Sequence, residues 1–139
     1  MNSDGWGLHP QLARDTMELG DLALSRVLIT KDANYPWLLV VPRRPGIVEI
    51  IDLDEVEQAQ LMVEIARVSR ALKAVTQCDK INVAALGNAV PQLHVHVIAR
   101  RKTDKAWPKP VWGAAEPLDH DEAELDRFVD AMTKKLWVG

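Results

Sequence analysis

Two of the four histidines, His94 and His96, stand two positions apart in the apolar segment 92–98, which reads Gln-Leu-His-Val-His-Val-Ile. Side chains alternate between the two faces of a β-strand, so a strand here places Gln92, His94 and His96 on one face, each about 6.6 Å from the next at roughly 3.3 Å per residue. A buried polar group without a partner costs about 1–3 kcal/mol. A ligand rich in oxygen atoms would satisfy all three side chains at once.

Two other interpretations of the histidine pair stay open at this point. The polar side chains could line the exposed face of a half-solvated sheet. The pair could also ligate a metal ion, which needs at least a third ligand. His9 and His120 are distant in sequence, and the single cysteine, Cys78, excludes a zinc site built from several cysteines.

The residues around the histidine segment favour an anion as the ligand. Asn82 lies on the preceding apolar segment, Gly87 and Asn88 occupy the connection, and the basic run 100–102 begins with Arg100. Amides, imidazoles, a glycine turn and guanidinium groups together are suited to phosphate. Taken alone, the basic run is more typical of a solvated strand end.

Periodicity and turn residues predict an α+β fold, in which helices lie on one side of an antiparallel sheet of about five strands. The order of elements is expected to be strands at 25–31 and 37–42, a long helix that opens at Asp52 or Asp54 and runs to about Thr76, strands at 81–86 and 92–99, and a C-terminal helix from Asp121 to about Trp137. The long helix has an acidic cap with glutamate three residues on, and contains neither glycine nor proline.

Composition narrows the class of protein. The 139 residues predict one domain, 1–139, with 47% hydrophobic and 27% charged residues. A net charge of -3 argues against nucleic acid as the main partner. No apolar run approaches the roughly 20 residues of a membrane span, and segment 1–10 does not look like a signal peptide. With a single cysteine, we expect a cytoplasmic protein that has no membrane partner.

The segment 92–98 resembles the signature of the histidine-triad (HIT) family, His-φ-His-φ-His-φ-φ with φ apolar, in which the first histidine is replaced by Gln92. The resemblance extends over about residues 25–101, through the strand Leu-Leu-Val-Val-Pro-Arg-Arg, the long helix, the Ile-Asn-Val strand and the Gly-Asn turn. The tail 106–113, Ala-Trp-Pro-Lys-Pro-Val-Trp-Gly, is similar to that of a bacterial branch described as HIT-like or diadenosine-tetraphosphate-hydrolase-like.

The resemblance implies a nucleotide hydrolase or transferase that is a homodimer. His94 would attack the α-phosphorus of a dinucleoside polyphosphate or nucleoside phosphoramidate and form a nucleotidyl-histidine, while His96 would contact phosphate oxygens. Gln92 can donate a hydrogen bond to phosphate, but it cannot carry a proton. The family needs no metal for this step in most branches, although Mg²⁺ helps some polyphosphate cleavers. The alternative is a catalytically weakened nucleotide-binding or scaffold protein.

Several positions depart from the family pattern or allow two roles. Asn88 can replace a glutamine amide, but Ala89 supplies no hydroxyl where many relatives have one, and Trp37 stands where relatives often have a histidine. Asp32 lies where relatives contact the ribose, although a turn-forming role is also expected. Asn82 aligns with the family pattern better, as an inward-facing amide. The tryptophans of segment 107–112 could pack on the domain or cover the phosphate site.

Overall fold

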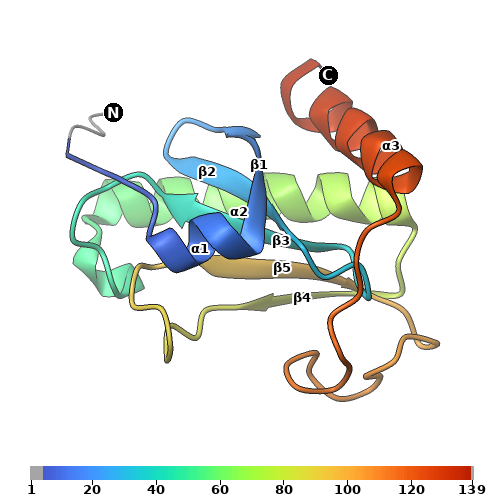
Figure 1. Cartoon of the computed structure of the whole chain (residues 1–139). Coiled ribbons are helices and arrows are strands. Elements are labelled where there is room, and N and C mark those ends of the chain that lie inside the picture. The colour runs from blue at the N-terminus through green and yellow to red at the C-terminus, as the bar shows by residue number, and fades with distance from the viewer. Residues whose placement is uncertain (1–4, 139) are drawn as a thin grey trace.

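The computed structural model describes residues 5–138, and it has the expected α+β architecture of one five-stranded antiparallel sheet with helices (Figure 1). The elements in chain order are α1 (Pro10–Asp15), β1 (Thr16–Asp21), β2 (Ser25–Thr30), β3 (Trp37–Pro42), the 3-10 turn η1 (Ile50–Asp52), α2 (Glu55–Thr76), β4 (Lys80–Ala84), β5 (Val95–Arg100), α3 (Glu122–Thr133) and the π-helical turn η2 (Lys134–Val138).

The sheet has the strand order β1-β2-β3-β5-β4, in which every neighbouring pair is antiparallel. β1 is the strand that the sequence patterns did not locate. β5 begins at Val95, not at Gln92, and β4 ends at Ala84, two residues before the predicted end. The long connection 85–94 therefore carries Gln92 and His94 up to the start of β5 without regular strand pairing.

One face of the sheet carries the main core. Alternate residues of β5, Val95, Val97 and Ala99, pack with the buried face of α2 and with Met132 of α3. In Figure 1, α2 runs behind the sheet and α3 lies above it. Burial of this apolar face is the dominant force that joins the helices to the sheet.

The opposite face of the sheet carries a smaller apolar cluster beneath α1. Leu12 of α1 packs with Leu28, Leu39 and Val41, and Trp37 lies at its edge. In Figure 1, α1 is in front of the strands, on the side away from α2. The other residues of β5, His96, Ile98 and Arg100, face this side, and their polar groups therefore lie between the sheet and the segments that cover it.

Both long helices begin after a predicted acidic cap, and of the two candidates for α2 the structure uses Asp54 and not Asp52. The Asp54 side chain accepts a hydrogen bond from the backbone N–H of Glu57 at 2.8 Å, and Asp121 does the same for Glu124 at 3.0 Å. α2 ends at Thr76, and its C-cap residue Gln77 has a left-handed φ of 56°. The C-terminal helix is shorter than predicted, because regular α-helix gives way to a π-helical turn at residue 134.

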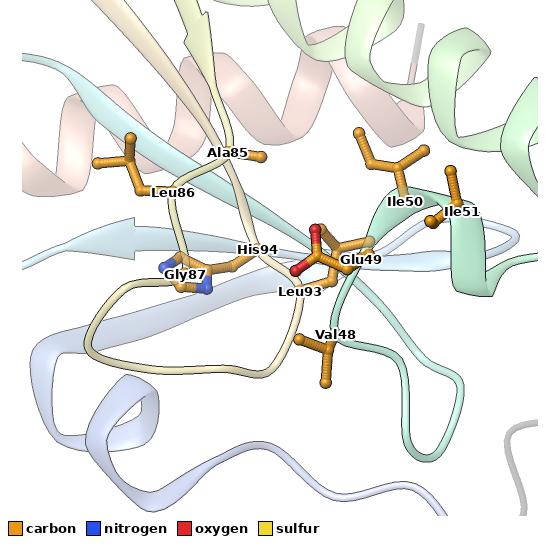
Figure 2. Close-up of a pocket in the computed structure, with 9 residues that line it drawn as sticks. All are labelled: Val48, Glu49, Ile50, Ile51, Ala85, Leu86, Gly87, Leu93 and His94. Carbon is orange, nitrogen blue, oxygen red and sulfur yellow. The ribbon is translucent and has the colours of Figure 1, made fainter.

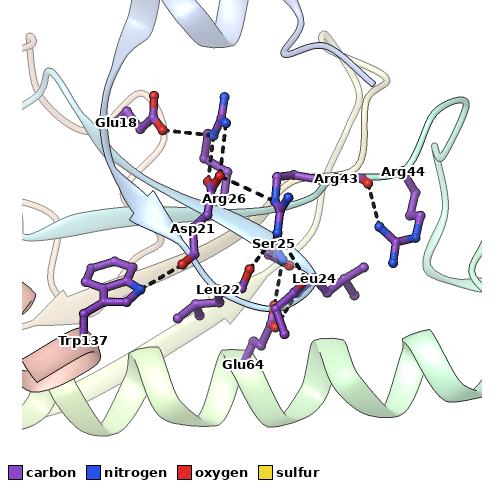
Figure 3. Close-up of polar contacts among 11 residues, drawn as sticks. Glu18, Asp21, Leu22, Leu24, Ser25, Arg26, Arg43, Arg44, Glu64 and Trp137 are labelled. Atoms are coloured by element: carbon purple, nitrogen blue, oxygen red, sulfur yellow. Dashed lines mark hydrogen bonds and ion pairs between the residues drawn. The ribbon is translucent and has the colours of Figure 1, made fainter. Parts of the chain in front are cut away.

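A buried carboxylate fastens the β1–β2 turn to α2 (Figure 3). Glu64 is fully buried and accepts hydrogen bonds from the backbone N–H groups of Leu24 and Ser25, at 2.8 and 2.9 Å, and from the Gln60 amide at 2.8 Å. Three donors offset the desolvation of this carboxylate. Because residues 24 and 64 are far apart in sequence, the contact fixes the hairpin against the helix.

The C-terminal turn is fastened to the end of the same hairpin. The indole N–H of Trp137 donates to the backbone oxygen of Asp21 at 2.8 Å, as Figure 3 shows. A Cβ atom at Gly20 would lie 2.8 Å from the Trp137 ring, closer than such contacts occur. Glycine is therefore the residue that permits this close approach of the ring to β1.

No helix in residues 5–138 has the length and hydropathy needed to cross a membrane.

Candidate active site

His94 lies directly before β5 with one ring nitrogen held by the backbone. Its Nδ1 is 2.7 Å from the carbonyl oxygen of Gln92. A carbonyl only accepts hydrogen bonds, so Nδ1 carries the hydrogen and Nε2 of the neutral ring holds the lone pair. The ring is 8% exposed. This is the arrangement that a nucleophilic histidine requires, with one nitrogen oriented and the other free to attack.

His96 is held in the opposite tautomer by Trp37. The indole N–H of Trp37, at the start of β3, donates to His96 Nδ1 at 2.9 Å. Nδ1 therefore holds the lone pair, and the hydrogen of the neutral ring is on Nε2. The His94 and His96 ring centroids are 5.1 Å apart, so neighbouring rings offer one nitrogen lone pair and one N–H donor.

His96 stays neutral over the physiological pH range. Burial, and to a smaller extent the nearby His94, lower its pKa from 6.5 to about 4. The ring is packed between the indoles of Trp37 and Trp112, at centroid distances of 5.8 and 5.0 Å. His96 can therefore donate a hydrogen bond to a phosphate oxygen without being an imidazolium.

Gln92 does not lie in line with the two histidines on a strand, because β5 begins three residues later. Its amide oxygen accepts a hydrogen bond from the backbone N–H of His9 at 2.8 Å, and its amide nitrogen donates to the carbonyl oxygen of Gly7 at 2.8 Å. The side chain is thus engaged with the N-terminal segment. Its contact with phosphate stays a prediction.

A cavity of about 500 Å³ opens onto both histidines. Its size is in the range of small-molecule sites. The lining combines apolar side chains with charged groups, and includes Leu12, Arg14, Asp15, Lys31, Asp32, Trp37, Leu39, Val90, His94 and His96. A nucleoside needs an apolar surface for its base and polar groups for its sugar, and this cavity offers both next to the reactive nitrogens.

Asp32 lines the cavity and also makes the turn. Its Oδ1 accepts hydrogen bonds from the backbone N–H of Asn34 at 2.9 Å, from the Asn34 side chain at 2.8 Å and from the backbone N–H of Leu118 at 3.2 Å. The turn-forming role expected from the sequence is therefore present. The position of the carboxylate in the cavity lining is compatible with ribose contact as well, which stays a prediction.

Asn82 and Arg100 lie on the same side of the sheet as the histidines, but they contact each other. Arg100 Nη1 donates to Asn82 Oδ1 at 2.8 Å, and the guanidinium also bonds both carboxylate oxygens of Asp104 and the Lys109 carbonyl. Arg100 is 1% exposed. These partners give Arg100 the role of holding the loop 101–113, and its contact with an anion stays a prediction.

The loop after β5 brings its two tryptophans to different places. Trp107 lies over the Arg100 guanidinium, 5.5 Å from its centre, whereas Trp112 packs edge-on against His96. The hydrogen bonds from Arg100, helped by the backbone N–H groups of Arg101 and Trp107, lower the pKa of Asp104 to about 2 against the opposing effect of burial. An ionised Asp104 thus anchors the loop that places Trp112 beside the site.

A second cavity, of about 240 Å³, borders His94 from another direction (Figure 2). Figure 2 shows the segment 48–51 on one side and the connection 85–87 with the His94 ring on the other. Gly87 has a φ of 72°, a left-handed conformation that glycine adopts without strain. Asn88 is exposed in the turn that follows. Within residues 5–138 there is no cluster of three or more side chains suited to holding a metal ion.

Comparison with known proteins identifies the family. The HIT domain family matches residues 13–103. The chain belongs to the HIT domain family. Members of this family generally act on nucleotides, which agrees with two histidine rings beside a cavity of small-molecule size.

Solved histidine triad proteins have the same fold. A histidine triad protein from Bradyrhizobium japonicum is 67% identical, with a TM-score of 0.94 over 95% of this chain and 98% of that one. A histidine triad protein from Sinorhizobium meliloti is 40% identical, with a TM-score of 0.93 over 97% and 100% of the two chains. One from Marinobacter aquaeolei is 41% identical, with a TM-score of 0.90 over 94% and 96%. Among curated proteins no match was found.

Three parts of this HIT domain site were not identified from the sequence. The α1 wall of the cavity is too short for hydrophobic periodicity, although Pro10 at its first position is a helix-start signal. The hydrogen bond from Trp37 depends on the pairing of β3 with β5. The ion pair of Asp104 with Arg100 spans four residues, a spacing that predicts a contact only within a helix. Because the segment is a loop, the spacing gave no prediction here.

Proposed function

We propose that the protein hydrolyses or transfers the nucleotidyl group of a substrate by attack of His94 Nε2 on its α-phosphorus. The nitrogen–phosphorus bond forms as the bond to the leaving group breaks. Water then attacks the phosphorus, the nitrogen–phosphorus bond breaks, and a nucleoside monophosphate and free His94 result. The observation that carries the proposal is the pair of opposite tautomers, which puts a lone pair on His94 Nε2 and a hydrogen on His96 Nε2, in rings whose centroids are 5.1 Å apart.

An adenylyl group is the transferred group we propose. The apolar part of the 500 Å³ cavity would take the base, the Asp32 carboxylate would face the sugar hydroxyls, and His96 would donate to a phosphate oxygen as negative charge develops. Asn88 and Gly87, in the connection before the triad, would contact the phosphate when it is bound.

The leaving group that fits the site best is a polyphosphate. An amine leaving group must take up a proton as it departs, but His96 is neutral with a pKa of about 4 and Gln92 cannot move a proton. A polyphosphate departs as a stable anion. We therefore expect diadenosine tetraphosphate to be cleaved with a higher kcat/KM than adenosine phosphoramidate at pH 7. In this proposal the nucleophilic step requires no metal, and Mg²⁺ would act on the polyphosphate. EDTA should therefore slow the cleavage of diadenosine tetraphosphate and leave the cleavage of adenosine phosphoramidate unchanged.

The covalent step is tested by trapping the intermediate. The protein is mixed with labelled diadenosine tetraphosphate, quenched in mild base, and analysed by mass spectrometry for an adenylyl adduct on His94. The adduct should disappear in His94→Ala and persist in His120→Ala, since His120 bonds the Thr30 carbonyl and does not line the same cavity. Absence of both adduct and turnover, with AMP still bound, would mean that the protein is a nucleotide-binding or scaffold protein instead.

We also propose that the protein is a homodimer. β4 is an edge strand of the sheet, and Val83 on it is exposed. The outward face of α2 carries exposed Val56, Met62 and Val63, apolar groups that a second copy of the chain would cover. Sedimentation equilibrium should give a dimer for the wild type and a monomer for Val63→Asp. Leu118→Asp, which changes an exposed apolar residue elsewhere, should remain dimeric.

A further inference from the structure

We propose that Gln92, at the first position of the histidine triad, is a positioning residue that clamps the N-terminal segment onto the substrate cavity. The inference rests on the proposed function for its effect on substrate, but the clamp itself is a property of the free protein. The clamp gives Gln92 a role in substrate binding, whereas the family counterpart at this position is the first histidine of the triad.

The clamp consists of two hydrogen bonds that use both ends of one amide. Gln92 Oε1 accepts from the His9 backbone N–H, and Gln92 Nε2 donates to the Gly7 carbonyl, each at 2.8 Å. In an extended chain, the carbonyl before a residue and the N–H after it point to the same side. The glutamine amide therefore bonds the backbone on either side of Leu8 as a neighbouring strand would.

The clamped segment leads directly into the wall of the cavity. His9 is the N-cap of α1, and its ring Nδ1 accepts the backbone N–H of Gln11 at 3.0 Å. α1 and its end then contribute Leu12, Arg14 and Asp15 to the lining of the 500 Å³ cavity. A helix of six residues does not hold its shape alone, so its place depends on anchors at both ends.

Glutamine suits this clamp and histidine does not. The two backbone atoms lie on one side of the segment, and a primary amide presents an acceptor and a donor side by side to match them. A neutral imidazole also has one acceptor and one donor, but they lie on different edges of the ring. A histidine at position 92 could make one of the two bonds at most, and the wall would be held less firmly.

Amide hydrogen exchange of the free protein tests the clamp without any substrate. Gln92→Ala should raise the exchange rate of the backbone N–H groups in residues 9–15, of which Pro10 has none, by about five- to tenfold, since each lost bond is a modest net contribution. The matched control is Gln58→Ala, which removes one amide bond to the Leu53 carbonyl at the start of α2. The control should leave exchange at residues 9–15 unchanged, and thermal unfolding of both variants verifies that they are folded.

Steady-state kinetics with diadenosine tetraphosphate then tests the effect on substrate. Gln92→Ala should raise KM by about five- to tenfold and change kcat by less than about twofold, because a displaced wall weakens binding without touching the reacting atoms. Gln92→His should show the same rise in KM and no gain in kcat. The dissociation constant for AMP, measured by calorimetry, should rise in parallel.

Two results would overturn the inference. Unchanged exchange at residues 9–15 in a folded Gln92→Ala would show that there is no clamp. A fall in kcat that Gln92→His restores, at constant KM, would show that position 92 acts on the phosphate. If the wild type proves inactive, hydrogen exchange at residues 9–15 and the dissociation constant for AMP still show whether the clamp exists. Failure of the proposed function is therefore distinguishable from failure of the clamp.

Discussion

Replacing Trp37 with phenylalanine should release His96 from its fixed tautomer. The indole N–H donates to His96 Nδ1 at 2.9 Å, and the ring packs in the aromatic group around the site. Phenylalanine keeps an aromatic ring in this place and removes the donor. The substitution therefore separates the hydrogen bond from the packing.

The size of the effect follows from one buried hydrogen bond. A net contribution of about 1 kcal/mol corresponds to a change of about fivefold in the ratio of the two His96 tautomers. The N–H of Trp37 also opposes protonation, because a protonated Nδ1 would face another donor. Its removal should raise the pKa of His96 from about 4 by roughly one unit, since one unit is worth 1.36 kcal/mol. The productive donor at Nε2 becomes less populated, so kcat should fall, by at most about fivefold.

Nitrogen NMR of the histidine rings measures both quantities directly. Two-bond proton–nitrogen spectra identify the tautomer of each ring, and a titration gives each pKa. Wild-type His96 should be the Nε2–H form down to about pH 4. Trp37→Phe should show a mixture of tautomers, a higher pKa for His96 and the lower kcat.

The matched control is Trp112→Phe. Trp112 also packs against the His96 ring, at a centroid distance of 5.0 Å, but makes no hydrogen bond to it in the described structure. Its substitution should alter neither the tautomer nor kcat by more than about twofold. The reasoning would be refuted by a wild-type His96 in the Nδ1–H form, or by a Trp37→Phe variant with an unchanged tautomer and pKa.

The low pKa of His96 also makes stability depend on pH in a defined window. The unfolded chain takes up this proton near pH 6.5 and the folded protein only near pH 4, so acid favours unfolding between these values. The contribution of neutral His96 to the free energy of unfolding is fully present above pH 6.5. It falls by up to about 3 kcal/mol as the pH is lowered to 4, and it changes no further below pH 4. Urea unfolding at pH 7.5 and 4.5 should show a smaller loss for His96→Gln than for the wild type.

Two further substitutions test the packing that supports the site. Asp104→Asn leaves the buried Arg100 charge without its carboxylate and should lower the free energy of unfolding in urea by about 3–5 kcal/mol, whereas Asp130→Asn, in an exposed ion pair, should change it by less than about 1 kcal/mol. Gly20→Ala drives a Cβ against the Trp137 ring and should cost about 1–3 kcal/mol, and a melting temperature equal to that of wild type would contradict the close contact.

The parts of the fold that were predictable are those with local signals. The start of α2 follows from the Asp54 cap, and its length follows from a run free of glycine and proline. β3 was predicted with its observed bounds, because its apolar run ends at Pro42 and two further breakers follow it. β1 was missed because its six residues include a glycine and two acids, and the strand forms through pairing with β2.

The candidate site divides in the same way. The alternation of side chains along β5 correctly predicted that Val95 and Val97 lie in the core and that His96 lies on the other face. Extension of the strand back to Gln92 was wrong, because the chain there turns toward the N-terminal segment and pairs its side chain with backbone groups some 80 residues away. Contacts at such separations leave no periodic trace in the sequence, and the Arg100–Asn82 bond was hidden for the same reason.

The amide clamp at position 92 has a consequence for how the sequence can change. Glutamine and histidine codons differ by one nucleotide, so a triad with all three histidines is a single mutation away. That mutation would loosen the bonds to Gly7 and His9 at the moment it restored the imidazole. Position 92 and the N-terminal segment are therefore epistatically coupled, and a neutral route between the two forms of the site must alter residues near 7–9 first.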